Sequence, residues 1–173
     1  MLHHASLGVS DIERSTTFYD AALAALGYVR VWDDIRPGET GQAVGYGLPG
    51  GGDKLAIKHR PEGQRPAGPG FHLAFTAPNR QAVHQFHAAA IAHGGSDNGG
   101  PGLRPDYGEH YYAAFIVDPD GHALEAVFNS AEQPKRRFVQ ASSGRSFGSN
   151  WMMVIHFAVS AGFFSFSTSI EIS

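Results

Sequence analysis

The chain contains one internal repeat, and this repeat constrains the fold more than any other feature of the sequence. Residues 4–27 align with residues 72–95 without a gap, at a constant offset of 68. Each copy opens with a histidine in a short apolar run, continues into a helix-start signal and ends at a glycine. Such a repeat predicts two structurally equivalent units. It also places His4 and His72 at equivalent points of two equivalent strands.

Each copy is predicted to contain a strand, a helix and further strands. In the first copy, Ser10 and Glu13 have the spacing of a capping box at the start of a helix. Asn79 is the expected cap of the second helix, and His122, beside the D-P-D-G turn, is expected at the surface. A loop rich in Gly, Asn and Asp is expected from the end of this helix to about Tyr107. Alternation and turn residues predict strands over 3–9, 28–32, 41–48, 54–58, 71–76, 111–117 and 122–128.

These elements predict an α+β fold of paired βαβββ modules. One such unit has too small a core to stand alone, so the two are expected to pack with pseudo-twofold symmetry and to form a curved sheet around a cleft. The first module is assigned to residues 1–60, a Pro- and Gly-rich connector to 61–70 and the second module to 71–130. Residues 131–173 form an atypical C-terminal extension.

Composition excludes several classes of function. The net charge of −3 does not suggest a nucleic-acid surface, and the absence of cysteine excludes disulfides, a thiolate nucleophile and a zinc–sulfur site. The N-terminus lacks the basic region of a signal peptide, so a cytoplasmic location is expected. The uncharged run in the extension is long enough for a bilayer, but its serines, histidine and glycine favour an extension over a membrane span.

The last predicted strand carries an acid at its centre, Glu125, where the first module has Ala56. A carboxylate among apolar residues is costly to bury unless it is paired, and a bound cation supplies such a partner. His4, His72 and Glu125 therefore form a candidate site of two histidines and one carboxylate. Three protein ligands leave positions open for substrate on Fe(II), Mn(II), Ni(II), Co(II) or Zn(II). The alternative is a metal-free cleft that binds an apolar ligand.

Four further residues are candidates for substrate binding. Tyr111 and Tyr112 alternate along a strand, so only one can face the cleft, and Tyr112 is the candidate. Arg104 and Tyr107 belong to the long loop that can cover the cleft. His110 is a candidate proton carrier at the cleft mouth, because histidine titrates near neutral pH.

Three segments of the chain resemble the vicinal oxygen chelate superfamily, which includes glyoxalase I, bleomycin-resistance proteins, fosfomycin-resistance transferases and extradiol dioxygenases. These segments are HHASLGVSDIERSTTFYDAALAALG, FHLAFTAP and YYAAFIVDPDGHALEAV, and the resemblance covers roughly residues 4–128. It implies that His4, His72 and Glu125 are the metal ligands. The departure is Ala56, where glyoxalase I has a carboxylate that is both fourth ligand and catalytic base.

The resemblance implies a metal-dependent enzyme, a lyase, isomerase or dioxygenase, that acts on a small oxygen-bearing substrate chelated by the metal. Glu125 is its expected catalytic residue, and a divalent metal ion is its expected cofactor. The missing carboxylate at Ala56 speaks against a standard glyoxalase I reaction. A homodimer is expected, because relatives often pair. The alternative function is a metal-free binding protein that resembles the bleomycin-resistance proteins.

Overall fold

The computed structural model describes residues 2–62 and 66–130. These residues belong to one compact unit, which ends at Pro134. The predicted extension, 131–173, lies outside the described residues. Within the described residues, neither helix has the length and apolar character needed to cross a bilayer.

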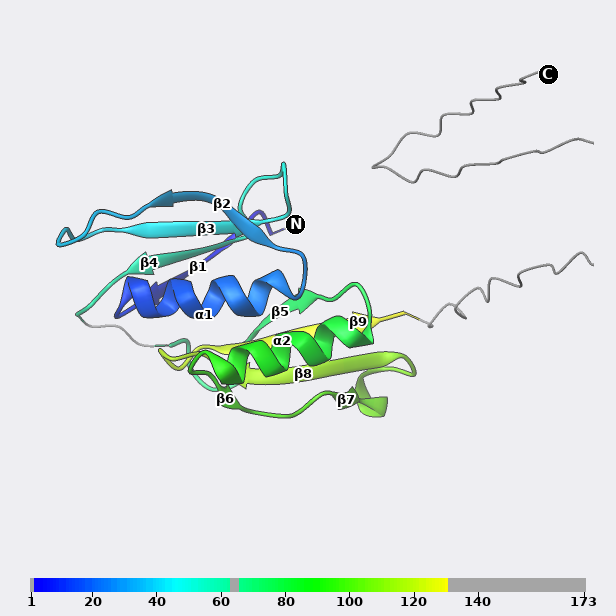
Figure 1. Cartoon of the computed structure of the whole chain (residues 1–173). Coiled ribbons are helices and arrows are strands. Elements are labelled where there is room, and N and C mark those ends of the chain that lie inside the picture. The colour runs from blue at the N-terminus through cyan, green and yellow to red at the C-terminus, as the bar shows by residue number, and fades with distance from the viewer. Residues whose placement is uncertain (1, 63–65, 131–173) are drawn as a thin grey trace, which may run out of the picture. The chain divides into compact units, whose positions relative to one another are not determined.

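The described residues form two modules, each with one helix and one sheet (Figure 1). The elements of the first module are β1 (Ala5–Val9), α1 (Ile12–Ala24), β2 (Val29–Asp34), β3 (Ala43–Gly47) and β4 (Leu55–His59). Those of the second are β5 (Leu73–Thr76), α2 (Arg80–Ala92), β6 (Ser96–Asp97), β7 (Gly102–Leu103), the 3-10 helix η1 (Pro105–Tyr107), β8 (Tyr111–Val117) and β9 (Ala123–Asn129). The predicted α+β class is confirmed.

The repeat seen in the sequence is a repeat of structure. Helices α1 and α2 both contain 13 residues, and α2 begins and ends 68 positions after α1. In each module the first strand pairs in parallel with the last, β1 with β4 and β5 with β9. Ser6 lies opposite Ala56 in the first pair, and Ala74 lies opposite Glu125 in the second. Ala56 and Glu125 therefore occupy equivalent positions, as the alignment predicted.

The second module differs from the first in its middle strands. The first sheet has the order β1-β4-β3-β2, whereas in the second β8 pairs with β9, β6 and β7. Strands β6 and β7 contain two residues each and lie in the segment predicted to be a loop. That part of the prediction was wrong, because two-residue strands built on Gly, Ser and Asp carry no alternating apolar pattern.

The two helices begin in the same way, because each has a cap whose side chain accepts a hydrogen bond from the amide three residues later. Asn79 caps α2 as predicted, and its side chain accepts a hydrogen bond from the Ala82 amide at 2.9 Å. The capping box predicted for α1 was wrong. Asp11 is the cap of α1 and accepts from the Arg14 amide at 3.0 Å, while Ser10 points to the other module.

One apolar core joins the modules. Each helix packs against the sheet of its own module, and α1 and α2 pack against each other (Figure 1). Successive residues of a strand point to opposite faces, so alternate residues of each sheet enter this core. The largest fully buried apolar side chains are Tyr19, Tyr46, Phe18, Phe86, Leu23, Leu55, Ile57, Ile116 and Leu124.

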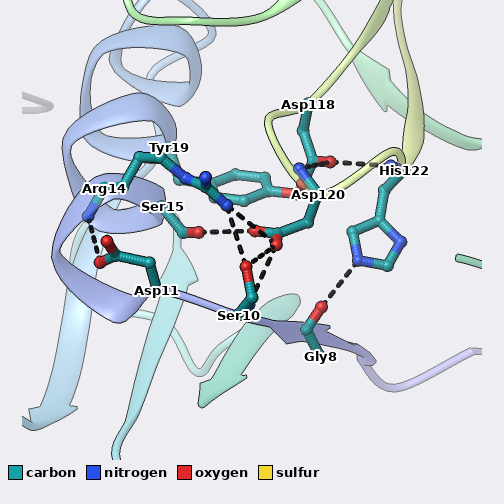
Figure 2. A network of polar contacts seen from close by, with 9 residues as sticks. All are labelled: Gly8, Ser10, Asp11, Arg14, Ser15, Tyr19, Asp118, Asp120 and His122. Carbon is teal, nitrogen blue, oxygen red and sulfur yellow. Dashed lines mark hydrogen bonds and ion pairs between the residues drawn. The ribbon is translucent and has the colours of Figure 1, made fainter. Parts of the chain in front are cut away.

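A buried carboxylate, Asp120, connects the turn between β8 and β9 to the first module (Figure 2). One oxygen accepts from the Ser10 amide at 3.0 Å and from the Ser10 hydroxyl at 2.5 Å. Arg14 donates to the same oxygen at 3.0 Å, and the Ser15 hydroxyl donates to the other at 3.0 Å. Only 4% of the Asp120 side chain is exposed, so these bonds fix the turn against the start of α1.

Two further contacts join the same turn to the first module (Figure 2). The Tyr19 hydroxyl donates to Asp118 at 2.7 Å, and the His122 Nε2 lies 2.8 Å from the Gly8 carbonyl oxygen. Because a carbonyl only accepts, the Nε2 carries the proton. His122 is 4% exposed, so its predicted surface position was wrong. No sequence pattern indicated the contact with Gly8, because it joins residues from different modules.

Candidate functional site

Glu125 lies near the centre of β9 on the face that points away from the helices, yet it is only 1% exposed. One carboxylate oxygen accepts from the Tyr111 hydroxyl at 2.7 Å. The other lies 3.0 Å from His72 Nε2. Phe115 pairs with Glu125 across β8 and β9, and its ring lies edge-on to the His72 ring at 6.3 Å. Together, Glu125, His72, Tyr111 and Phe115 form the Glu125 cluster.

The environment of Glu125 explains how a charge can lie in this strand. A buried carboxylate is tolerated where hydrogen bonds or an opposite charge stabilise it, and here a phenol and an imidazole do so. Burial raises the pKa of Tyr111 to about 12, and the hydrogen bond to the Glu125 carboxylate adds to the increase. Tyr111 therefore remains protonated at neutral pH, and its hydroxyl donates the hydrogen bond to Glu125. The His72 side chain is 45% exposed, so one end of the cluster is open to solvent.

His4 lies at the position that the repeat predicts, but the structure does not group it with His72 and Glu125. It directly precedes β1, as His72 directly precedes β5, and it is exposed. Its Nδ1 lies 2.9 Å from the Nδ1 of His3. Across residues 2–62 and 66–130, no three His, Asp or Glu side chains are arranged to hold a metal ion. Within one chain the structure thus brings His72 and Glu125 together and does not add His4.

The tyrosine beside Glu125 is not the one predicted. Tyr112 lies on the helix-facing side of β8, where its hydroxyl is 2.7 Å from His84 Nε2 and the Arg80 guanidinium stacks on its ring at 4.9 Å. Tyr111 faces Glu125 instead. The sequence contained enough information to choose Tyr111. A hairpin centred on the D-P-D-G turn puts the odd-numbered residues of β8 and β9 on one face, and Tyr111 and Glu125 are both odd-numbered.

The loop residues Arg104 and Tyr107 both contact the cluster. The Arg104 guanidinium lies over the Phe115 ring at 5.4 Å, and the Tyr107 ring meets the Tyr111 ring edge-on at 5.4 Å. Both were predicted to lie in a loop that can cover the site. His110 is half-buried just before β8.

The geometry of His72 and Glu125 fits two ligands of one metal ion. Two ligand atoms that bind a metal at about 2.1 Å and at about a right angle lie about 3 Å apart. The His72 nitrogen and the Glu125 oxygen are 3.0 Å apart. Imidazole and carboxylate suit a divalent transition metal, and a third ligand is still needed.

Comparisons with known proteins agree with this architecture. Residues 1–126 match the model of the Glyoxalase/Bleomycin resistance protein/Dioxygenase superfamily. A glyoxalase/bleomycin resistance protein from Albidiferax ferrireducens T118 is 33% identical, with a TM-score of 0.56, over 72% of this chain and 94% of that one. A glyoxalase-related enzyme from Fulvimarina pelagi is 25% identical, with a TM-score of 0.54, over 73% of this chain and 86% of that one.

A more distant structure shares the fold and holds a metal. It is a point mutant of a genomically encoded fosfomycin resistance protein from Listeria monocytogenes, complexed with Mn(II) and 1S,2S-dihydroxypropylphosphonic acid. It is 17% identical, with a TM-score of 0.53, over 75% of this chain and 90% of that one. No curated protein matches the chain. The match to the family model over most of the chain, together with the paired modules, shows that this protein belongs to the glyoxalase/bleomycin resistance protein/dioxygenase superfamily.

Proposed function

We propose that the protein is a metal-dependent enzyme of this superfamily that acts on a small substrate through oxygen atoms bound to the metal. The observation that carries the proposal is the pairing of His72 with the buried Glu125 at 3.0 Å, which matches the spacing of two ligands on one metal. Membership of the family and the Mn(II) of the Listeria structure support a divalent ion.

His4 is the third proposed ligand, and we assign it to a second copy of the chain. It is exposed, it directly precedes the edge strand β1, and among the described residues it is not gathered with the other two ligands within one chain. The equivalent strand β5, which His72 precedes, is likewise an edge of its sheet. A homodimer that brings β1 of one chain to β5 of the other completes two identical sites, as a twofold interface requires.

The bound metal supplies Lewis acidity, which stabilises negative charge that develops on the substrate oxygens. The chain's own residues position that ion and the substrate. Glu125 contributes the charge among the ligands, and Tyr111 holds its carboxylate in one orientation through the 2.7 Å hydrogen bond. Arg104 and Tyr107, which contact the aromatic rings of the cluster, are the proposed substrate-binding residues, together with His110.

Metal binding tests the proposal directly. We expect the purified chain to bind one Mn(II) per chain, measured by titration with detection of free Mn(II) by electron paramagnetic resonance. Glu125→Gln and His72→Ala should each weaken binding at least about tenfold, because each removes a ligand. His84→Ala is the matched control for His72→Ala, since His84 is also an exposed histidine, but its Nε2 contacts the Tyr112 hydroxyl and not Glu125. Equal affinity of Glu125→Gln and the parent excludes Glu125 as a ligand.

Mixing two variants that each lack one proposed ligand tests whether the metal site is shared between chains. His4→Ala lacks one ligand, and Glu125→Gln lacks another. In a mixed dimer with shared sites, one site combines the intact His4 of one chain with the intact His72 and Glu125 of the other. High-affinity Mn(II) binding should therefore reappear on mixing. If the ligands come from a single chain, every site lacks one ligand and mixing restores nothing.

The alternative function is a metal-free binding protein for a small molecule. One observation favours it: His72 and Tyr111 already satisfy the Glu125 carboxylate without a metal. A parent chain that binds no divalent metal at millimolar concentration supports this alternative and contradicts the enzyme proposal.

A further inference from the structure

The segment from β7 to η1 lies along the edge of β8 that does not pair with β9. Leu103 of β7 pairs with Tyr112, and the Arg104 amide donates to the Tyr111 carbonyl at 2.7 Å. Two side chains of this segment then reach the aromatic residues of the cluster, Arg104 to Phe115 and Tyr107 to Tyr111. The backbone hydrogen bond holds this segment beside the strand that carries Tyr111 and Phe115.

The Arg104 guanidinium lies among three glycines, Gly99, Gly100 and Gly102. One nitrogen, Nη2, donates to the Gly100 carbonyl at 2.7 Å, and the central guanidinium carbon lies over the Phe115 ring, 5.4 Å from its centre. A Cβ added at Gly102 would lie 3.1 Å from Nη1, and one added at Gly99 would lie 3.2 Å from the Phe115 ring and 3.5 Å from Nη2. The guanidinium therefore occupies space that side chains at these two positions would restrict.

The charge of Arg104 has no counterion among the described residues. Three other arginines there are paired: Arg14 with Asp120, Arg30 with Asp20, and Arg36 with Asp34 and Glu39. Arg104 makes one hydrogen bond to a neutral carbonyl and one contact with an aromatic ring.

A guanidinium has five N–H donors in a planar fork that fits carboxylate and phosphate oxygens. Only one of these donors has a partner among the described residues. The remaining donors of a fixed cation are then available to a ligand. Phe115 links this cation to the proposed metal site, because its ring contacts both Arg104 and His72.

We propose that Arg104 is the anion-binding residue of the Glu125 site, and that the substrate is a small organic acid. A carboxylate or phosphonate-type group of the substrate binds the Arg104 guanidinium, while other oxygen atoms of the substrate reach the metal. This inference rests on the proposed function, because it takes the Glu125 cluster as the reaction site. A role for Arg104 as a brace for its own loop is the competing explanation.

The probe is methylphosphonate, added to the full chain first without metal and then with Mn(II). Dimethyl sulfone, a neutral tetrahedral molecule, is the matched control ligand. We expect methylphosphonate to shift the NMR resonances of residues 99–115, with dimethyl sulfone leaving them unchanged. Arg104→Gln should weaken methylphosphonate binding about tenfold or more, since hydrogen bonds to charged groups contribute about 1.5–3 kcal/mol. Arg104→Lys should retain part of the affinity, because it keeps the charge and loses the fork.

Arg60→Gln is the matched control variant. Arg60 also donates one hydrogen bond to a backbone carbonyl, that of His59 at 2.7 Å, and it is exposed. Its replacement should leave methylphosphonate affinity unchanged. If Arg104→Gln proves unstable, Gly102→Ala provides the second test, because it keeps the charge and crowds the guanidinium.

Three results would overturn the inference: no binding of methylphosphonate to the parent, equal binding by Arg104→Gln, or an equal response to the neutral control. A loop that loosens in Arg104→Gln without a change in anion affinity identifies the brace role. These results are separate from those for the proposed function. Mn(II) binding without an effect of Arg104 removes only the anion subsite, whereas anion binding without metal binding removes only the metal enzyme.

Discussion

The Tyr111 hydroxyl donates a 2.7 Å hydrogen bond to Glu125, and this contact contributes to the raised pKa of Tyr111. Burial first and the Glu125 carboxylate second raise the pKa of Tyr111 to about 12. Glu125→Gln removes the carboxylate and leaves the burial, so the pKa of Tyr111 should fall toward the ordinary tyrosine value of about 10 without reaching it. Phenolate absorbance recorded against pH measures the titration of the tyrosines. The part of this signal that is missing in Tyr111→Phe belongs to Tyr111. An unchanged pKa in Glu125→Gln contradicts the contact.

The same hydrogen bond should matter for metal binding. A group that orients a ligating carboxylate typically contributes a factor of about 10–100 to metal affinity. Tyr111→Phe should therefore weaken Mn(II) binding by about tenfold. Tyr112→Phe is the matched control, because Tyr112 is the next residue of β8 and contacts His84 on the other side of the strand. Equal losses in the two variants would show that Tyr111 acts through general stability and does not act through Glu125.

The contacts of Asp120 predict a loss of stability in acid. Burial alone raises its pKa, but the hydrogen bonds from Ser10 and Ser15 and the charge of Arg14 outweigh burial, and the net pKa is lowered. A carboxyl group whose pKa is lower in the folded than in the unfolded state stabilises the fold above the unfolded value. This contribution is lost as the pH falls below about 4 toward the folded-state pKa.

Asp120→Asn should lower the free energy of unfolding at pH 7 by about 2–4 kcal/mol, since it removes an acceptor with a buried charge and leaves donors unpaired. Urea unfolding at several pH values measures the change. The difference between the parent and the variant should shrink as the pH falls below about 4 toward the lowered pKa of Asp120, because the parent carboxylate becomes protonated over that range. Asp106→Asn is the control, because Asp106 is exposed. A difference that is constant with pH contradicts the assigned charge contacts.

The sequence was sufficient to predict what depends on local pattern. The gapless repeat predicted two helices at an offset of 68, and the structure has both at that offset. It also predicted that Ala56 and Glu125 are equivalent, which the parallel pairing of β1 with β4 and of β5 with β9 confirms. Alternation and register are short-range properties, so they can be read from residues that are neighbours in the sequence.

Two of the errors occur where one module contacts the other. Ser10 has the spacing of a helix cap, but Asp120 binds both its amide and its hydroxyl, so Asp11 takes the cap. His122 follows a turn motif, which usually lies at the surface, but its imidazole reaches the Gly8 carbonyl. These contacts join residues more than a hundred positions apart, and no local pattern in the sequence indicates them.

Gly95 tests how closely the modules pack. A Cβ added there would lie 2.8 Å from the Phe18 ring, 2.9 Å from the Ala90 carbonyl oxygen and 3.1 Å from the Val117 carbonyl oxygen. Two of these neighbours are backbone atoms of α2 and β8, which cannot move without displacing the elements that carry them. Gly95→Ala should therefore lower the free energy of unfolding by about 1–3 kcal/mol, the usual effect of overpacking.

Gly68→Ala is the matched control for this substitution. Gly68 has no neighbour within 4 Å of an added Cβ, so its replacement should have no effect or stabilise the chain slightly by restricting the unfolded state. Urea unfolding of both variants at neutral pH makes the comparison. Phe18→Leu should reduce the loss of unfolding free energy caused by Gly95→Ala, because the smaller side chain leaves the position of the ring free. Part of the loss should persist, because the contacts with the two carbonyl oxygens remain. Full stability of Gly95→Ala would show that α2 and β8 lie farther apart at this point than the structure places them.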